Sequence, residues 1–337
     1  MTRIAINGLG RIGRAAFKVI LDTPELELVA INDITPAKEL IYLLSYDSVY
    51  GRYEKSIEFN NNEINIDGKS IKVFSEKDPS QLPWKDNNID IVFECSGHFT
   101  KKEQMQKHID AGAGYVILSA PAKGDNIPYV IPGVNEPNSE DKLISTASCT
   151  TNCIAPVMEI LERTVGVKKA IMTTVHAYTS SQSIVDAPHN KRRRGRAAAT
   201  NFVPTSTGAA KATSRALPKF ENIFDGVAIR GPVACGSIAD ITVVTSRETS
   251  KEEINKIFQE EASNKRYEGI LGTTNNDLVS SDIIKDPRAS IVDTEMTMVV
   301  DGDLVKIMSW YDNEWGYVNQ MIKAGVMLGS QIKEPVS

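Results

Sequence analysis

The stretch RIAINGLGRIG, residues 3–13, decides the fold of the first part of the chain. A short apolar run leads directly into glycines spaced GxGxxG, at Gly8, Gly10 and Gly13, and the helical pattern RIGRAAFKVILD (11–22) follows. Glycines at this spacing allow a tight turn, close approach of the backbone to a pyrophosphate and close packing of helix on strand. Free N–H groups at the start of a helix favour phosphate. The stretch therefore predicts a dinucleotide-binding unit.

An acidic residue follows at the interval that this unit requires. Asp33 ends the second strand pattern, LVAIND (28–33), about 20 residues beyond Gly13. A carboxylate at this place binds the 2′-hydroxyl of a ribose and repels a 2′-phosphate. We therefore expect NAD, rather than NADP, as the cofactor.

The first half of the chain alternates buried strands with helices. Further short runs rich in Val, Ile and Leu lie at 89–97, 115–120 and 143–148, and a helical stretch lies at 101–112. Near-continuous apolar runs of this length are typical of a parallel sheet that is covered on both faces. The alternation predicts an α/β fold, with an N-terminal Rossmann-type, doubly wound parallel sheet.

The pattern changes after about residue 168, where the strands become longer and more clearly alternating. Asp301-Gly302 separates two strand patterns and predicts a hairpin turn. We expect a second, α+β domain with a mixed or antiparallel sheet. The expected domains are 1–148, completed by a C-terminal helix within 314–337, and 149–313.

Composition limits the classes of protein that need consideration. The chain has 337 residues, 41% of them hydrophobic and 24% charged, with a net charge of −5. These values are typical of a globular protein, and no apolar run approaches the roughly 20 residues that span a bilayer. The N-terminus lacks the layout of a signal peptide, so we expect the cytoplasm, where thiols stay reduced. The negative charge argues against general affinity for nucleic acid.

One segment departs from this average, the basic run KRRRGR at 191–196. Basic runs occur in nucleic-acid patches, in targeting signals and in solvated loops. Recognition of an anion at an active site is a further interpretation.

The segment STASCTTNCIAP (145–156) holds two of the four cysteines. A strand pattern precedes Cys149 and a helical pattern follows it, so this thiol lies at a strand–helix junction. The helix dipole and free N–H groups there predict a lowered pKa for Cys149. Proline is tolerated in the first turn of a helix, so Pro156 favours a helix that starts between residues 148 and 152. Cys153 lies one turn further on.

Four interpretations of this cysteine pair differ in what they require. A metal site needs further ligands, and no spaced Cys/His set lies nearby, so no metal is expected. A disulfide is disfavoured in a reducing compartment. A nucleophile with a bystander is favoured, and a pair of buried structural cysteines remains open.

A nucleophilic cysteine requires a base, usually histidine. The four histidines are His98, His108, His176 and His189. By elimination His176, in the strand pattern TTVHAYT, is the best candidate, although a single histidine on a strand is commonly structural. Hydroxyl-rich segments at 148–150, at Thr179 and at 205–208 have the groups that bind tetrahedral anions.

The whole chain resembles phosphorylating glyceraldehyde-3-phosphate dehydrogenase. The resemblance rests on INGLGRIGR, LLSYDSVYGR (43–52), LSAPAK (118–123), SASCTTNCIAP, VHAYTSSQ, STGAAKA (206–212) and WYDNEWGY (310–317). It implies that Cys149 attacks the aldehyde and that His176 is the base. Oxidation by NAD then gives a thioester, which inorganic phosphate cleaves to an acyl phosphate.

The resemblance also implies roles for other residues. Thr179 and Arg230 would hold the phosphate of the substrate. The attacking phosphate would bind Ser148, Thr150, Arg194, Thr207 and Gly208. Cofactor contacts would come from Gly8, Gly10, Arg11, Ile12, Gly13, Asp33, Ser119, Asn313 and Tyr317.

The resemblance further implies a homotetramer, and it places the basic run in a loop that lines the active site. Ser181 and the segment 231–239 depart from the family pattern, whereas Ile34 and Pro188 fit a preference for NAD. Two alternatives remain: an erythrose-4-phosphate dehydrogenase of the same family, and a non-catalytic protein that binds NAD or RNA.

Overall fold

The computed structural model describes residues 1–124 and 127–333. The chain forms two compact units. The first contains Met1–Val130, Glu136–Ala147 and the chain from Met321 onward, and the second contains Ile131–Asn135 and Ser148–Gln320. Residues 334–337 of the expected C-terminal helix lie outside the described residues. Within the described ranges, no helix combines the length and the apolar character that crossing a membrane requires.

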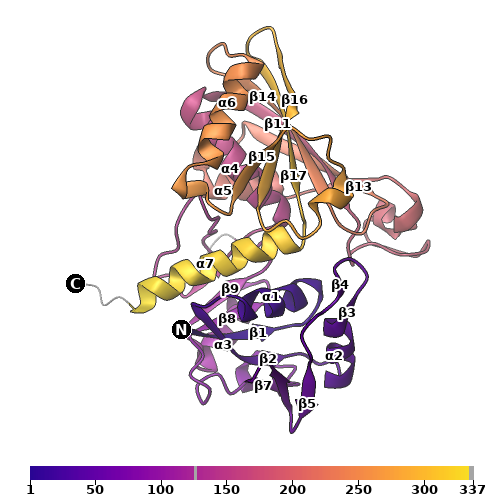
Figure 1. Cartoon of the computed structure of the whole chain (residues 1–337), viewed down its shortest axis with the longest axis vertical. Coiled ribbons are helices and arrows are strands. Elements are labelled where there is room, and N and C mark those ends of the chain that lie inside the picture. Colours follow the sequence, from indigo (N-terminus) through magenta and orange to yellow (C-terminus); the bar gives the residue numbers. More distant parts are fainter. Residues whose placement is uncertain (125–126, 334–337) are drawn as a thin grey trace. The chain divides into compact units, whose positions relative to one another are not determined.

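The first unit is built on an eight-stranded sheet with the order β10-β9-β8-β1-β2-β7-β6-β5 (Figure 1). Its strands are β1 (Thr2–Asn7), β2 (Leu26–Asn32), β5 (Glu58–Asn60), β6 (Glu63–Ile66), β7 (Lys69–Phe74), β8 (Ile91–Glu94), β9 (Tyr115–Leu118) and β10 (Leu143–Ser145). A separate pair is formed by β3 (Tyr46–Asp47) and β4 (Gly51–Arg52). The helices of this unit are α1 (Arg11–Leu21), α2 (Ala37–Ser45), α3 (Lys102–Asp110) and the short 3-10 turn η1 (Pro79–Gln81).

The pairs from β10 through to β7 are parallel, and β5 and β6 extend the sheet with antiparallel pairs. After β1 the chain forms β2 and β7 on one side of β1. It then forms β8 and β9 on the other side. This reversal at β1 is the topological switch point of a doubly wound sheet, and ligands bind there at the carboxyl ends of the strands. The predicted Rossmann-type domain is confirmed.

The second unit has a seven-stranded mixed sheet with the order β12-β13-β11-β14-β17-β16-β15. Its strands are β11 (Val167–Ala177), β12 (Val203–Ser206), β13 (Phe224–Gly231), β14 (Ser237–Thr245), β15 (Leu271–Thr274), β16 (Ser290–Val300) and β17 (Leu304–Tyr311). Its helices are α4 (Cys149–Thr164), α5 (Ala209–Ala216) and α6 (Lys251–Ala262), and α7 (Trp315–Lys333) starts in this unit. Short 3-10 turns are η2 (Arg192–Gly195), η3 (Ala198–Thr200), η4 (Pro218–Phe220), η5 (Lys265–Tyr267) and η6 (Ser280–Ile283).

The predicted hairpin at Asp301-Gly302 is confirmed. Asp301, Gly302 and Asp303 join β16 to β17, which pair antiparallel, and the first two have positive φ, 50° and 74°. Positive φ at successive residues is typical of the tight turns that join hairpin strands. With parallel pairs at β11–β13 and β15–β16 among antiparallel ones, the predicted mixed-sheet domain is confirmed as well.

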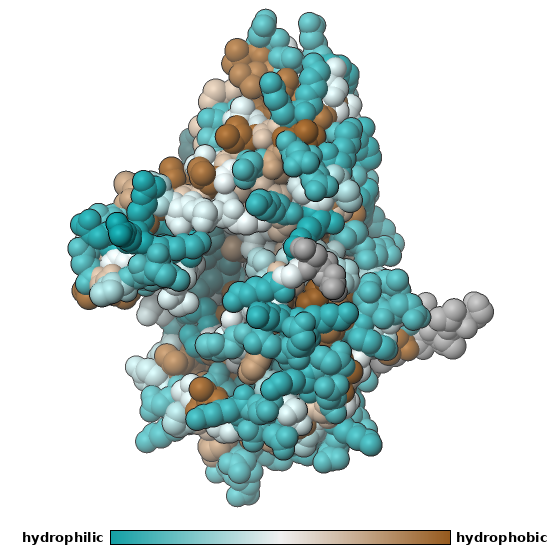
Figure 2. Space-filling view, turned by 180° about the vertical axis from the view of Figure 1, so that it is seen from behind, coloured by the Kyte–Doolittle hydropathy of each residue, from teal (hydrophilic) through white to brown (hydrophobic). Residues whose placement is uncertain are grey.

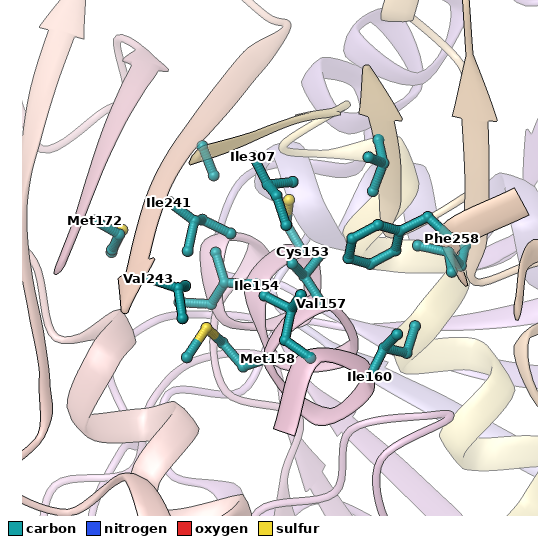
Figure 3. Packing of buried hydrophobic residues seen from close by; sticks show 14 of the residues in the cluster. Cys153, Ile154, Val157, Met158, Ile160, Met172, Ile241, Val243, Phe258 and Ile307 are labelled. Carbon is teal, nitrogen blue, oxygen red and sulfur yellow. The ribbon is translucent and has the colours of Figure 1, made fainter. Parts of the chain in front are cut away.

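Helix α4 fixes the core of the second unit. Figure 3 shows Ile154, Val157 and Met158 of α4 against Ile241 and Val243 of β14. All five side chains are fully buried. Burial of each such side chain stabilises the fold by about 1.5–3 kcal/mol, so α4 is held firmly on the sheet.

The start of α4 was predicted correctly, but the argument from Pro156 was wrong, because it assumed that this proline lies in the first turn. Pro156 lies inside α4, beyond its first turn. A proline there removes one helical hydrogen bond. The buried packing of α4 outweighs this loss, because residues on both sides of Pro156 are fully buried.

The glycines of the GxGxxG motif differ in whether the structure has space for a Cβ atom at each position. Gly8 has a φ of 91°, and a Cβ on Gly13 would lie 1.9 Å from the Gly8 carbonyl oxygen. A Cβ on Gly10 would meet no atom within 4 Å, and its φ of −64° suits any residue. Gly13 is therefore required by the packing of α1 on β1, whereas Gly10 is not.

We predict that Gly13→Ala lowers the free energy of unfolding by about 1–3 kcal/mol or more, because overpacking forces the backbone apart. Urea denaturation at fixed protein concentration measures the change. Gly10→Ala is the matched control and should unfold like the wild type. Equal stability of the two variants would contradict the packing argument.

Candidate active site

Cys149 is the first residue of α4. Ser148 is the N-cap, and its Oγ accepts a hydrogen bond of 3.2 Å from the Thr151 N–H. Ala147, just before the cap, has a φ of 55°, in the left-handed region. The chain thus turns sharply into the helix, and Cys149 lies where the free N–H groups of α4 are. Cys149 is partly exposed, whereas Cys153 is fully buried in the core.

His176, near the end of β11, faces this thiol. The distance from Cys149 Sγ to His176 Nε2 is 3.3 Å, which is hydrogen-bond contact for sulfur. His176 is buried and its ring lies edge-on to that of Tyr311 at 5.9 Å. A thiol against a buried imidazole is the arrangement of an activated cysteine nucleophile. Of the four histidines, the structure brings His176 to Cys149.

Arg230 of β13 lies on the other side of the imidazole. The strands β11 and β13 are parallel neighbours, and their register places Arg230 opposite His176. Arg230 Nη1 lies 2.8 Å from His176 Nδ1 and 3.0 Å from the Ala177 carbonyl oxygen. The same carbonyl oxygen lies 2.7 Å from Nδ1.

This setting shifts both titrating groups. Burial and, next, the Arg230 guanidinium lower the pKa of His176 from 6.5 to about 3. Burial also raises the pKa of the Cys149 thiol, although Arg230 and hydrogen bonds around Thr150 act in the opposite direction. The expected lowering of the Cys149 pKa by the helix dipole is therefore wrong, because desolvation of the thiolate is the larger effect. Burial therefore acts against the charged form of each group.

Thr150 takes part in a buried hydroxyl chain that the sequence did not reveal. Thr150 Oγ1 lies 2.9 Å from the Tyr311 hydroxyl, which lies 2.7 Å from Thr174 Oγ1. Burial raises the pKa of Tyr311 well above its ordinary value, so its phenol stays protonated. Tyr311 thus links α4, β11 and β17 beneath the Cys149–His176 pair. The only signal for it was its place in the motif WYDNEWGY.

Two residues of the predicted anion sites, Thr179 and Arg194, are joined through Ser181. The Ser181 hydroxyl lies 2.9 Å from Thr179 Oγ1, and Arg194 Nη1 donates to it at 3.4 Å. Arg194 also donates from Nε to Thr205 Oγ1 at 3.0 Å and from Nη2 to the Ser206 carbonyl at 3.3 Å. Arg194 is thus held between the segments that contain Thr179 and Thr207.

The remaining predicted anion ligands lie at helix starts. Ser148 caps α4, and its Oγ also contacts Thr151 Oγ1 at 2.7 Å. Gly208 is the N-cap of α5, where Thr207 Oγ1 accepts from the Ala209 N–H at 3.2 Å. Both places combine hydroxyls with free backbone N–H groups, as anions require.

Asn313 is fixed by the start of β14. Its Oδ1 accepts hydrogen bonds from the Gly236 N–H at 3.1 Å and from the Ser237 hydroxyl at 2.9 Å. The Ser237 hydroxyl in turn accepts from the Ala177 N–H at 3.1 Å, next to His176. With Oδ1 engaged, the amide NH₂ group of Asn313 is the part directed to other partners. Tyr317 is buried in the first turn of α7.

The first unit contains a cavity of about 520 Å³ at the switch point of its sheet. The cavity is lined by Gly8, Gly10 and Asp33, which were predicted to bind the cofactor, and by Ile34. Asp33 is held by two backbone donors, the Leu9 N–H at 2.6 Å and the Thr35 N–H at 2.8 Å. Its carboxylate is therefore fixed next to the glycine turn.

The cavity fits a dinucleotide. The open space at Gly10 leaves room for a group to approach the start of α1, and Asp33 supplies an acceptor for a ribose hydroxyl. The Arg11 side chain turns to Asp47, at 2.6 Å, so Arg11 and Ile12 present their backbone N–H groups at this helix start. Ser119 follows β9 at the same carboxyl edge.

Sequence reasoning missed several residues of this cavity. Asn7, Asn32, Glu76, Lys77, Ser96 and Phe99 line it, together with His98. Their signal was position, since most of them lie at or just after the carboxyl ends of parallel strands. Within the described ranges, no group of three or more His, Cys, Asp or Glu side chains gathers as a metal site would need.

Comparison with known proteins shows which family has this sequence. The model "Glyceraldehyde 3-phosphate dehydrogenase, NAD binding domain" matches residues 2–102, and the model of the C-terminal domain of the same enzyme matches residues 148–313. Glyceraldehyde-3-phosphate dehydrogenase 2 of Streptomyces avermitilis is 46% identical over 98% of this chain and 99% of its own length. The dehydrogenase of Thermotoga maritima is 48% identical over 96% of this chain and 97% of its own length. With both halves matched and relatives this similar over their full length, the chain belongs to the glyceraldehyde 3-phosphate dehydrogenase family.

Proposed function

We propose that this chain catalyses the NAD-dependent oxidative phosphorylation of D-glyceraldehyde 3-phosphate to 1,3-bisphosphoglycerate, a step of glycolysis and gluconeogenesis. The observation that carries the proposal is the 3.3 Å contact of Cys149 Sγ with His176 Nε2, with Arg230 beside the same ring. The full-length similarity to dehydrogenases of this name supports it. NAD is the cofactor, and when bound it accepts the hydride.

The chain's own residues account for the covalent steps. The Cys149 sulfur attacks the aldehyde carbon and forms a thiohemiacetal, and His176 accepts the proton that leaves the hydroxyl during oxidation. The resulting thioester keeps the free energy of oxidation, which attack by water would lose. Inorganic phosphate then cleaves the thioester to the acyl phosphate.

Two sets of residues are proposed to bind the two phosphates. Thr179 and Arg230 hold the phosphate of the substrate, and the 3.1 Å bond from the Tyr178 N–H to the Val233 carbonyl keeps their segments side by side. The attacking phosphate is assigned to Ser148, Thr150, Arg194, Thr207 and Gly208. The hydroxyls around Arg194 support this assignment, since a guanidinium surrounded by hydroxyls suits a tetrahedral anion.

The cofactor residues are proposed from both units. Gly8, Gly10, Arg11, Ile12, Gly13, Asp33 and Ser119 belong to the first unit, and Asn313 and Tyr317 to the second. We assign residues 1–148 with the C-terminal helix within 314–337 as the NAD-binding domain, and 149–313 as the catalytic domain. The fixed Oδ1 of Asn313 supports a role for its NH₂ group in orienting the nicotinamide carboxamide.

The four cysteines support a location in the cytoplasm, which is also part of the proposal. Among the described residues, Cys95, Cys149, Cys153 and Cys235 form no disulfide. Thiols that stay reduced are typical of that compartment. Binding of RNA through the run 191–196 has less support, because Arg196 pairs with Asp186 at 2.9 Å and Arg194 is engaged within the site.

The test of this function is the formation of NADH from glyceraldehyde 3-phosphate with and without inorganic phosphate. We expect sustained turnover only when phosphate is present, because the thioester needs a nucleophile other than water. Erythrose 4-phosphate serves as the competing aldehyde, and a higher kcat/KM with it would favour the other activity of the family. Equal rates without phosphate would contradict phosphorolysis.

Cys149→Ser should abolish the oxidation and leave NAD binding in place, because a serine hydroxyl lacks the nucleophilicity of a thiol. Cys153→Ser is the matched control, since it changes the same atom one turn deeper in α4. It should keep most of the activity. Retained turnover in Cys149→Ser would show that another residue is the nucleophile.

Gly10→Ala should weaken NAD binding about tenfold or more while the protein keeps its stability. The added methyl group enters the open space at Gly10, where we place the pyrophosphate. Tenfold corresponds to a loss of about 1.4 kcal/mol. Fluorescence titration with NAD measures the change, and an unchanged Kd would remove the pyrophosphate from this turn.

A homotetramer is also proposed, and the uncovered face of the second sheet supports it. Helices α4, α5 and α6 cover the opposite face. On the uncovered face Ile171 and Val227 are 63% and 51% exposed, and Val175 lies next to them on β11. Part of the apolar surface of the second unit is visible as brown groups at the top of Figure 2. Apolar patches of this kind mark contacts between proteins.

We expect Ile171→Glu to shift the protein to smaller oligomers, because a charge on this face must be desolvated on assembly. Sedimentation velocity gives the mass. Val279→Glu, at an equally exposed valine outside the sheet, is the control and should keep the wild-type mass. An unchanged mass for Ile171→Glu would exclude this face as the contact.

A further inference from the structure

We propose that Glu94 is a positioning residue for NAD: its carboxylate holds the glycine turn (8–13) and the loop after β8 (95–99) together before the cofactor binds. Glu94 is fully buried, and it acts through Asn7 and Ser96, which line the cavity of the first unit. The inference rests on the placement of NAD in this cavity, which belongs to the proposed function. It does not depend on which aldehyde is the substrate.

Glu94 lies where two segments of the cavity wall begin. It ends β8, and the register of β8 with β1 places it opposite Asn7. The glycine turn starts directly after Asn7, at Gly8, and the loop after β8 contains Ser96. A Cβ on Gly8 would lie only 2.5 Å from the Ser96 Cα, so the backbones of the turn and the loop are in direct contact. A shift of one segment against the other would therefore change the cavity.

The Glu94 carboxylate accepts hydrogen bonds from both segments. Asn7 Nδ2 donates to Oε2 at 2.5 Å. Ser96 donates twice to Oε1, from its N–H at 2.8 Å and from its hydroxyl at 2.5 Å. His108 Nε2 lies 3.1 Å from Oε2 and is the fourth partner. A buried carboxylate needs its lone pairs satisfied in this way, so the position of Glu94 fixes the positions of its partners.

The direction of the His108 bond is decided by Trp84. An indole N–H can only donate, and Trp84 Nε1 lies 3.0 Å from His108 Nδ1. An imidazole that accepts at Nδ1 carries its proton on Nε2, which faces Glu94. Both side chains are fully buried. His108 therefore supports the carboxylate from the side of α3, away from Asn7 and Ser96.

Asn7 is also fixed from the opposite direction. The Glu76 N–H donates to Asn32 Oδ1 at 2.8 Å, which decides the orientation of the Asn32 amide. Asn32 Nδ2 then donates to Asn7 Oδ1 at 2.7 Å, so Asn7 presents Nδ2 to Glu94. Asn32 and Glu76 line the cavity too. Each hydrogen bond of this chain donates in the direction of Glu94, so one carboxylate orients side chains of β1 and β2 and the segment after β7.

The consequence is a cavity whose shape is set before NAD binds. A site that is already ordered avoids the entropy cost of ordering it on binding. Without the carboxylate, the glycine turn and the loop lose their common acceptor, and binding must order them. The loss then concerns the affinity for NAD and not the steps at Cys149, which belongs to the second unit.

Glu94→Gln is the direct test, because it keeps the size of the side chain and removes the charge. In either orientation its NH₂ group faces donors, those of Asn7 and His108 or those of Ser96. We expect the Kd for NAD to rise about tenfold or more, which corresponds to about 1.4 kcal/mol. Calorimetric titration measures it. ADP-ribose, which lacks the nicotinamide, should lose the same factor, because the cavity belongs to the first unit.

Steady-state kinetics should show a split between KM and kcat. In Glu94→Gln the KM for NAD should rise with the Kd, whereas kcat at saturating NAD should stay close to that of the wild type. A fall in kcat with an unchanged KM would contradict a role in positioning NAD.

Trp84→Phe is the matched control. It removes the N–H that His108 accepts, so it lowers stability within the same buried network, but Glu94 keeps its four donors. Its Kd for NAD should equal that of the wild type. The same loss of affinity in Trp84→Phe as in Glu94→Gln would show that stability alone is responsible and would overturn the proposal.

Hydrogen exchange of the wild-type protein without NAD decides the matter even if Glu94→Gln fails to fold. The Ser96 N–H should be protected as well as the Cys95 N–H, which donates to the Asn7 carbonyl at 2.7 Å, and NAD should not change this. A Ser96 N–H that exchanges freely until NAD is added would mean that the cofactor, and not Glu94, orders the loop.

The affinity measurements also separate this proposal from the proposed function. If Gly10→Ala weakens NAD binding and Glu94→Gln does not, only the role of Glu94 is wrong. If neither variant changes the Kd, the cofactor lies elsewhere, and the proposed cofactor site and the role of Glu94 are both wrong.

Discussion

The contact between a thiol at the start of α4 and an imidazole near the end of β11 is the constraint on which the rest of the second unit depends. Both side chains come from rigid elements, and the packing of Ile154, Val157 and Met158 on the sheet fixes the distance between them. A site built on a helix start and a strand end tolerates little movement. The core therefore serves the chemistry directly, because a shift of α4 would separate Sγ from Nε2.

Much of the fold was predictable because local pattern and global fold agree. The glycine motif, the buried strand runs and Asp301-Gly302 each had one physical interpretation, and the structure has these elements where they were expected. The two-stranded extension β5–β6 and helix α2 were not predicted. These elements are short, and tertiary contacts decide their conformation.

Prediction was weaker where burial decides the state of a group. His108 lies in a polar helical pattern, yet it is fully buried between Trp84 and the Glu94 carboxylate. Cys149 was expected to have a lowered pKa, and desolvation reverses the direction. Pattern indicates which face of an element is buried, but the pairing of Arg230 with His176 depends on strand order, which the sequence does not state.

The Ser237 hydroxyl joins two features that are usually treated apart. It accepts from the Ala177 N–H, beside the base, and donates to Asn313 Oδ1, on the residue proposed to orient the nicotinamide. A shift at the start of β14 would therefore displace both His176 and the side chain of Asn313. Substitutions at Ser237 and Asn313 should couple thermodynamically, so that the double variant costs less than the two single losses together.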